Sequence, residues 1–335
     1  MEATTQTTDR SATDRSATDR SATDRRATDR RASDYDVAPD VAGLKIVFVN
    51  VYFIGEPRPG GDWVLVDAGL QNSAATIRSE AERLFGPDNP PKAILLTHGH
   101  FDHVGALPDL LKDWDAPVYT HPLELPFLQG KASYPPPDPA VGGGGMALLS
   151  WLFPTSSPSL GDRVRAYPSD CTVPELPDWR VIHTPGHSPG HVSLFRPNDR
   201  ALIAGDAFTM TNQNGVFEVM TQKEEMHGPP MYFTIDWVAA KDSVRKLASL
   251  NPTAAGTGHG KAISGPQLPQ RLDSLLQHFD ETEVPRNGRY VRQPAITDEE
   301  GVVDMPPPVS YHVAKAVGIG VLVGAAMWLM GGRRK

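Results

Sequence analysis

Residues 98–103 read His98-Gly99-His100-Phe101-Asp102-His103, and they follow directly on the apolar run Ala93-Ile94-Leu95-Leu96-Thr97. A short apolar run of this kind is typical of a buried strand, so the cluster is predicted to lie at a strand end. Imidazole nitrogen and carboxylate oxygen are the usual ligands of zinc and its neighbours. Side chains spaced this closely cannot all point at one tetrahedral ion. The stretch therefore predicts two adjacent metal ions, an arrangement typical of hydrolytic sites.

Three more potential ligands follow later in the chain, each after a predicted strand. His187 lies in a loop with two prolines and two glycines, Asp206 follows the apolar run 201–204, and His259 follows the glycine-containing run 254–258. A lone histidine is more often an ordinary surface or core residue than a ligand. These three are not isolated, because loops at strand ends gather functional side chains on a rigid scaffold.

The ordered set His-x-His-x-Asp-His, Pro-Gly-His, Gly-Asp and Gly-His resembles the metallo-β-lactamase-fold hydrolase superfamily over roughly residues 44–278. The resemblance implies an α/β fold, an αββα sandwich with its metals at one edge of two facing sheets. The stretch 228–237 is similar to a bacterial subgroup of these hydrolases, which narrows the branch without naming a substrate.

The resemblance also implies a role for each matching residue. It expects a first metal at His98, His100 and His187, and a second at Asp102, His103 and His259, with Asp206 bridging the two ions. Asp102 and Asp206 are the expected catalytic carboxylates. The expected cofactors are two Zn²⁺ ions, with iron or manganese as alternatives.

Two further residues are expected to support the ligands from behind. Asp67, in the segment 64–69, matches the first family motif, in which a carboxylate orients metal ligands. His183 is a weaker candidate, because it is predicted to end a strand.

The local pattern predicts strands at residues 47–54, 63–67, 181–182, 192–195 and 202–204. It predicts helices at 74–85, at 104–114 directly after the histidine cluster, and at 236–250. Strands and helices mixed in this way favour one hydrolase domain, which we predict to cover residues 39–285.

Composition limits the possible partners. The chain has 335 residues and a formal net charge of −8, which argues against nucleic acid and leaves a small-molecule substrate as the expected partner. The oligomeric state stays open. Cys171 is the only cysteine, so a disulfide within the chain is excluded, and we expect this residue to be small, buried and apolar.

The two ends differ from the middle of the chain. Residues 1–38 carry a Ser-Ala-Thr-Asp-Arg repeat without large apolar side chains before Tyr35, so a disordered arm is predicted. A Pro-containing linker is predicted at 286–312 and a transmembrane tail at 313–335. The 17 uncharged residues from Ala316 to Gly332 would span about 25 Å as a helix. These features predict a membrane-anchored protein whose catalytic domain is cytoplasmic.

The chemistry leaves several substrates open. The preferred prediction is a dinuclear zinc hydrolase that uses a metal-bridging hydroxide on an ester, thioester, lactone or related carbonyl compound. Lactonases of this family usually carry a tyrosine at the position of Thr209, which argues against a lactone. A mononuclear-iron persulfide dioxygenase and a membrane-tethered binding module are the alternatives. Residues 135–153 and 208–233 are either the cover of an apolar substrate pocket or ordinary loop and core.

Overall fold

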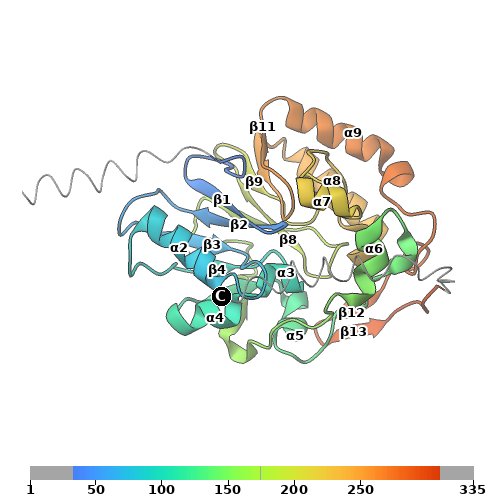
Figure 1. The fold of residues 1–335 in the computed structure, drawn as a ribbon, viewed down its shortest axis with the longest axis horizontal. Helices are drawn as coiled ribbons and strands as arrows, with labels where there is room; N and C mark the ends of the chain where they lie inside the picture. Colours follow the sequence, from blue (N-terminus) through green and yellow to red (C-terminus); the bar gives the residue numbers. More distant parts are fainter. Residues whose placement is uncertain (1–32, 174, 310–335) are drawn as a thin grey trace, which may run out of the picture.

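Two facing β-sheets with helices on both outer sides form the core of the computed structural model, which describes residues 33–173 and 175–309 (Figure 1). The six-stranded sheet has the order β1 (Val41–Ile46), β2 (Val49–Ile54), β3 (Val64–Val66), β4 (Ile94–Leu95), β5 (Val118–Thr120) and β6 (Val164–Ala166). The five-stranded sheet has the order β11 (Ile263–Ser264), β10 (Ala254–Gly256), β9 (Ala201–Ile203), β8 (Val192–Arg196) and β7 (Arg180–His183). The expected αββα sandwich is therefore confirmed.

Helices connect and cover the sheets. The α-helices are α2 (Ala74–Phe85), α3 (Phe101–Val104), α4 (Leu107–Asp113), α5 (Leu125–Leu128), α6 (Gly145–Leu149), α7 (Val216–Thr221), α8 (Trp237–Ser249) and α9 (Gln267–Thr282). The 3₁₀ turns are η1 (Pro122–Glu124), η2 (Pro139–Val141), η3 (Ser150–Leu152), η4 (Gly161–Arg163) and η5 (Met231–Phe233). Strands β12 (Ile296–Asp298) and β13 (Gly301–Asp304) form a separate hairpin.

Side-chain alternation along the strands explains the layers. In β2, Val51 and Phe53 pack with α2 and α4 in one buried cluster, whereas Tyr52 and Ile54 pack in another cluster with strands of the second sheet. Successive side chains of a strand point to opposite faces, so one apolar strand contributes to two cores. The same alternation in β9 joins the inner core to the core beneath α8 and α9.

The predicted strand 47–54 and helix 104–114 needed correction. A turn at Val47, whose φ is 58°, separates β1 from β2, and β1 was missed. The helix begins earlier than expected, at Phe101 within the histidine cluster, and it breaks between α3 and α4. Pro108 has no N–H to donate to Val104 and is well tolerated in the first turn of a helix, so a new helix is favoured to begin here. The helices expected at 74–85 and 236–250 are confirmed.

The expected membrane anchor is corrected. Within residues 33–173 and 175–309, no helix is long and apolar enough to cross a bilayer. The longest, α9, has 16 residues and would reach about 24 Å, short of the ~30 Å of a hydrocarbon core. Because of this finding, the prediction of a membrane-anchored protein is not retained. The predicted tail 313–335 and most of the arm 1–38 lie outside the described residues.

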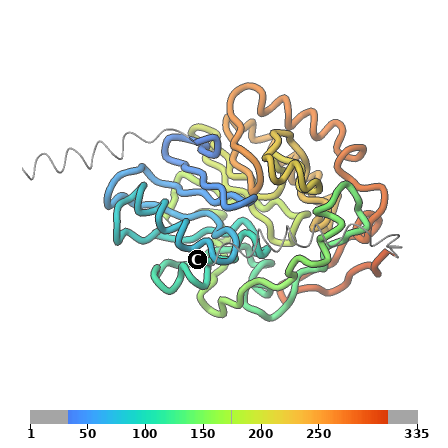
Figure 2. Tube along the Cα trace, in the orientation of Figure 1, coloured from blue at the N-terminus to red at the C-terminus, as the bar shows by residue number. Residues whose placement is uncertain are grey.

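Two smaller features complete the fold. Cys171 is exposed rather than buried, and it lies in a bend before β7 with a positive φ of 61°. The β12–β13 hairpin lies beside a segment much earlier in the chain (Figure 2), and a side chain at Gly301 would meet Ala132. The domain boundaries predicted at residues 38 and 285 remain predictions.

Candidate metal centre

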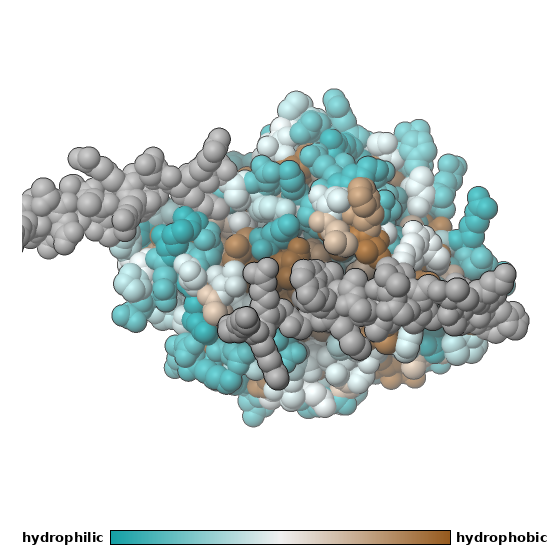
Figure 3. Space-filling model, in the orientation of Figure 1, coloured by the Kyte–Doolittle hydropathy of each residue, from teal (hydrophilic) through white to brown (hydrophobic). Residues whose placement is uncertain are grey.

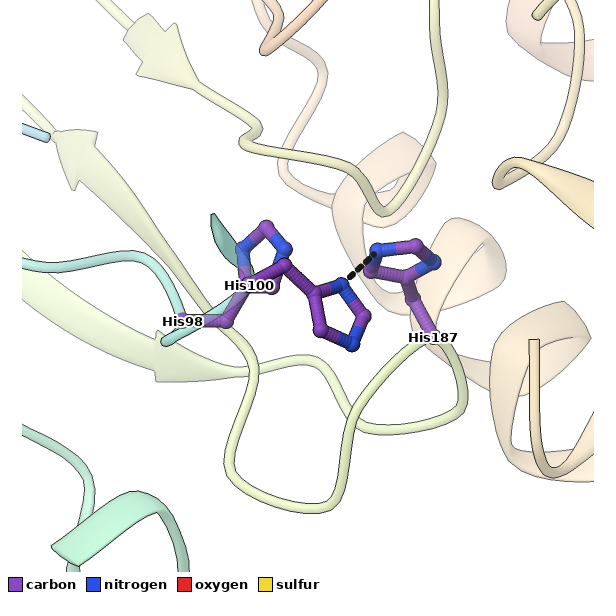
Figure 4. A group of neighbouring side chains, drawn as sticks. All are labelled: His98, His100 and His187. Carbon is purple, nitrogen blue, oxygen red and sulfur yellow. Dashed lines mark hydrogen bonds between the residues drawn. The ribbon is translucent and has the colours of Figure 1, made fainter. Parts of the chain in front are cut away.

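Seven side chains from loops far apart in the sequence converge at one edge of the two sheets. They form three overlapping groups of three side chains. Within each group the potential ligand atoms lie within 4.8 Å of one another, and every side chain is buried. Figure 4 shows His98, His100 and His187 of one group turned toward each other. The three groups are His98, His100 and His187; His98, His103 and Asp206; and Asp102, His103 and His259.

Both sheets contribute to this convergence. His98 and His100 follow β4 of the six-stranded sheet, and the short α3 that starts after His100 carries Asp102 and His103. The remaining three come from the five-stranded sheet: His187 lies between β7 and β8, Asp206 follows β9, and His259 follows β10. Strands β3, β4 and β5 run parallel to one another, as do β9 and β10, so within each of these sets the loops that follow the strands lie at the same edge of the sheet.

The donor set fits metal ions. His98 Nε2, His103 Nε2 and Asp206 Oδ1 are buried and have no hydrogen-bond partner among the described residues. Burial of a polar atom without a partner costs several kcal/mol. In addition, His100 Nδ1 and His187 Nε2 approach to 2.9 Å. Unpartnered imidazole and carboxylate atoms facing one another are what a pair of cations would satisfy.

Asp206 lies between the two halves of the cluster. Its carboxylate is 3.4 Å from His187 Nε2, 3.6 Å from His103 Nε2 and 3.2 Å from His259 Nε2. Burial alone would raise the pKa of Asp206, but the neighbouring His259 and His103 hold that pKa well below its usual value. Asp206 is therefore an anion. It contacts His187 of the expected first-metal ligands and His103 and His259 of the expected second-metal ligands.

The histidines of the two sets differ in their electrostatics. Burial and the neighbouring imidazoles lower the pKa of His98 and His187, and burial with His103 lowers the pKa of His100 to about 3. These three rings are neutral, which is the form that binds metal. Burial also acts to lower the pKa of His103, but the carboxylates around it, chiefly Asp206 and Asp67, raise that pKa overall.

Asp67 lies behind the cluster, where the resemblance expected a supporting carboxylate. It accepts hydrogen bonds from Thr97 N at 2.8 Å and Thr97 Oγ1 at 2.7 Å, and its Oδ2 lies 2.8 Å from His103 Nδ1. Its backbone has a φ of 59°, which is uncommon for a residue with a side chain. This contact leaves His103 Nε2 directed at the cluster.

His183 does not join the seven side chains. Its ring stacks on His121 with centroids 4.0 Å apart, and its Nε2 lies 3.0 Å from the carbonyl oxygen of Pro189. It therefore contacts the backbone of the loop that carries His187 and not the ligands themselves.

Two supporting residues were not assigned from the sequence. His191 is fully buried, and its Nε2 accepts a hydrogen bond from the Asp206 N–H at 2.8 Å. Its position four residues after His187 was the only signal. Glu124 is also fully buried, and it accepts hydrogen bonds from the loop of His98 and His100 and from the loop of His187. No sequence pattern marked it, because its partners are distant along the chain.

An aromatic wall borders the cluster. Phe233 stacks on His100 with ring centroids 4.6 Å apart, and Tyr134 meets the same ring at 4.7 Å. The wall continues through Phe101 and Phe153, whose rings are 5.8 Å apart. Figure 3 shows apolar side chains gathered on the surface near α6 and α7. The exposed members of this surface are Leu148, Trp151, Leu152, Phe217 and Met220.

Thr209 occupies the position at which lactonases of the resembled family usually carry a tyrosine. It is buried, and its hydroxyl donates to the carbonyl of Thr211 at 3.0 Å. The hydroxyl is therefore engaged by the backbone.

The two facing sheets and the buried histidine–aspartate cluster define a metal-binding α/β protein, and the comparison with known families agrees with this class. A family model of the metallo-beta-lactamase superfamily matches residues 44–259, which is more than half of the chain. The chain belongs to the metallo-beta-lactamase superfamily. Within that superfamily it is a metallo-hydrolase, as its sequence relatives indicate.

Relatives and a solved structure share most of the chain. The probable metallo-hydrolase YflN of Bacillus subtilis (strain 168) is 46% identical over 245 residues, which cover 73% of this chain and 93% of that protein. The probable metallo-hydrolase YybB of the same strain is 32% identical over 64% of this chain and 82% of its own length. A beta-lactamase domain protein from Burkholderia ambifaria is similar in structure, with a TM-score of 0.50 at 20% identity over 75% of this chain and 79% of its own, which shows the fold alone.

Proposed function

We propose that this protein is a dinuclear zinc hydrolase that cleaves an ester, thioester or related carbonyl substrate. His98, His100 and His187 would hold one ion, Asp102, His103 and His259 the other, and Asp206 would contact both. The observation that carries the proposal is the convergence of these buried side chains into overlapping groups with unpartnered ligand atoms.

Bound divalent ions would supply two effects, a lowered pKa of a coordinated water and polarisation of the substrate carbonyl. Asp102 would help to hold the second ion as a carboxylate, and it would orient the coordinated water toward the substrate. Its side chain is 10% exposed, so it is the ligand best placed to meet a substrate entering from solvent.

The aromatic wall supports a substrate with an apolar group next to its carbonyl. Phe233 and Tyr134 cover the ring of His100, and they exclude water from that side of the cluster. Apolar surface beside a few convergent polar groups is the usual composition of a small-molecule site. Since the Thr209 hydroxyl donates to a backbone carbonyl, an ester or thioester remains preferred over a lactone.

Metal analysis with a substrate panel tests this function. We expect purified protein to bind two zinc ions per chain and to hydrolyse an aryl ester or an acyl thioester. The variant Asp206→Ala is expected to lose metal and to lower kcat/KM by more than about 100-fold, because removal even of residues behind the ligands costs ~10–100-fold. The exposed Asp242→Ala on α8 serves as the matched control.

Different results would favour the rivals. One iron per chain together with oxygen uptake on a persulfide would favour the dioxygenase. Full turnover by metal-depleted Asp206→Ala protein would refute the metal-dependent mechanism.

A further inference from the structure

Glu124 is a fully buried carboxylate that takes no part in the proposed reaction. One oxygen, Oε2, accepts from the Gly99 N–H at 3.0 Å and from the hydroxyl of Tyr134. The other, Oε1, accepts from Ser188 Oγ at 2.8 Å and from the Gly190 N–H at 2.7 Å. A buried carboxylate is costly unless such donors satisfy it.

The four donors belong to the surroundings of one group of ligands. Gly99 is the residue between His98 and His100, and Ser188 directly follows His187. The first loop follows a strand of the six-stranded sheet, and the second connects two strands of the five-stranded sheet. A single side chain therefore joins the two loops across the sandwich.

The packing leaves little room for either loop to move. A side chain at Gly190 would place its Cβ 2.7 Å from Glu124 Cγ, and one at Gly99 would meet the Tyr134 hydroxyl. Both glycines let the backbone approach the carboxylate closely enough for its N–H to donate. The contacts fix the distance between the loops as well as their orientation.

We propose that Glu124 is a positioning residue that sets the spacing of His98, His100 and His187 for the first metal ion. The proposal rests on the metal-dependent function above and extends it to a residue outside the ligand set. Partners of this kind, which hold ligand loops without touching metal, typically change metal affinity by about 10–100-fold.

The substitution Glu124→Gln tests the geometry with almost no change in volume. Each carboxylate oxygen faces one backbone N–H and one hydroxyl. A hydroxyl can reverse and accept from an amide NH₂, but a backbone N–H cannot. Whichever way the Gln amide is oriented, its NH₂ faces the N–H of Gly99 or that of Gly190, so one loop must move.

Glu283→Gln is the matched control. Glu283 is also buried and accepts at Oε2 from a glycine N–H, that of Gly228, at 2.9 Å. Its Oε1 accepts from the hydroxyl of Thr282 at 2.9 Å, and this hydroxyl can reverse. This glutamate caps α9 and contacts neither ligand loop in these bonds, so its replacement is expected to leave metal binding unchanged.

The readout is zinc affinity, measured by competition with a chromophoric chelator on the full chain. We expect wild type and Glu283→Gln to bind two ions, and Glu124→Gln to bind one of them about 10–100-fold more weakly with the other unchanged. Two smaller changes, Tyr134→Phe and Ser188→Ala, each remove one donor and are expected to weaken the same ion less. They replace Glu124→Gln as the test if that variant does not fold.

The outcomes separate the two proposals. Wild-type affinity for both ions in Glu124→Gln, or in both smaller variants if that one does not fold, would overturn the positioning role and leave the hydrolase proposal intact. Equal weakening of both ions would overturn it as well, because a role specific to the first metal would be absent. A wild-type protein that binds no metal would refute the proposed function, and the role of Glu124 with it.

Discussion

Single residues at this site are held in conformations that the chain would not adopt by itself. Asp67 has a positive φ of 59°, and its carboxylate nevertheless contacts Thr97 and His103. Such backbone conformations cost of order 1–3 kcal/mol and persist where the surroundings enforce them. In this conformation the Asp67 carboxylate contacts both Thr97, which follows β4, and the candidate ligand His103.

Asp67→Asn separates the charge of this residue from its shape. Asn tolerates a positive φ, so the backbone is expected to stay in place while the anion facing His103 is lost. We expect zinc affinity to fall about 10–100-fold, measured by chelator competition. Asp62→Asn, an exposed carboxylate in the preceding turn, is the control, and an equal effect in both variants would contradict the role.

At the scale of elements, α9 is held to the segment after α7 by an ion pair between the buried Glu283 and the partly exposed His227. Glu283 follows the last turn of α9, and its Oε2 lies 3.5 Å from His227 Nδ1. Burial alone would lower the pKa of His227, but Glu283 raises that pKa above 6.5 overall. Burial would raise the pKa of Glu283, whereas His227 lowers it below 4.5 overall.

These shifts predict a pH window for the stability of this contact. The His227 contribution is complete below pH 6.5 and is lost as pH rises through its raised pKa. The Glu283 contribution is complete above pH 4.5 and is lost as pH falls through its lowered pKa. The pair should therefore stabilise the fold most between these two values.

Urea unfolding of wild type and Glu283→Gln measures this effect. At pH about 5.5 we expect the variant to be less stable by about 1.5–3 kcal/mol, since hydrogen bonds to charged groups have this size. At pH about 8.5, above the ordinary histidine pKa, the difference should shrink. An unchanged difference at the two pH values would contradict the ion pair.

At the scale of the whole molecule, the metal centre joins the two sheets. His98, His100, Asp102 and His103 belong to the first sheet, and His187, Asp206 and His259 belong to the second. Ions bound by both sets would favour the folded state, because the unfolded chain does not bring these loops together.

Removal of metal should therefore lower the melting temperature. With free zinc at a thousand times its Kd, each bound ion contributes about 4 kcal/mol, which corresponds to roughly 8–16 °C per ion for a domain of this size. Calorimetry with and without a strong chelator measures the change. Asp206→Ala is the control and should show a smaller shift, whereas equal shifts in both proteins would contradict binding across the sheets.

Local patterns in the sequence predicted the main strands and the candidate ligands, and the family resemblance implied the layered sandwich. Apolar alternation in segments such as Val49–Ile54 specifies two buried faces, and the motifs place each donor directly after a strand. Both are properties of neighbouring residues, which sequence patterns record. The break between α3 and α4 was missed although Pro108 was visible, because the pattern of apolar residues was read across it.

The surroundings of those ligands became visible in the three-dimensional structure and not before. The bonds of Glu124 to Gly99 and Gly190, the bond from Asp206 to His191, and the stacking of Phe233 on His100 join residues far apart in the chain. No local pattern distinguishes a buried glutamate from an exposed one when its donors come from two distant loops. These contacts form only when the two sheets pack, so their residues became recognisable in the folded chain alone.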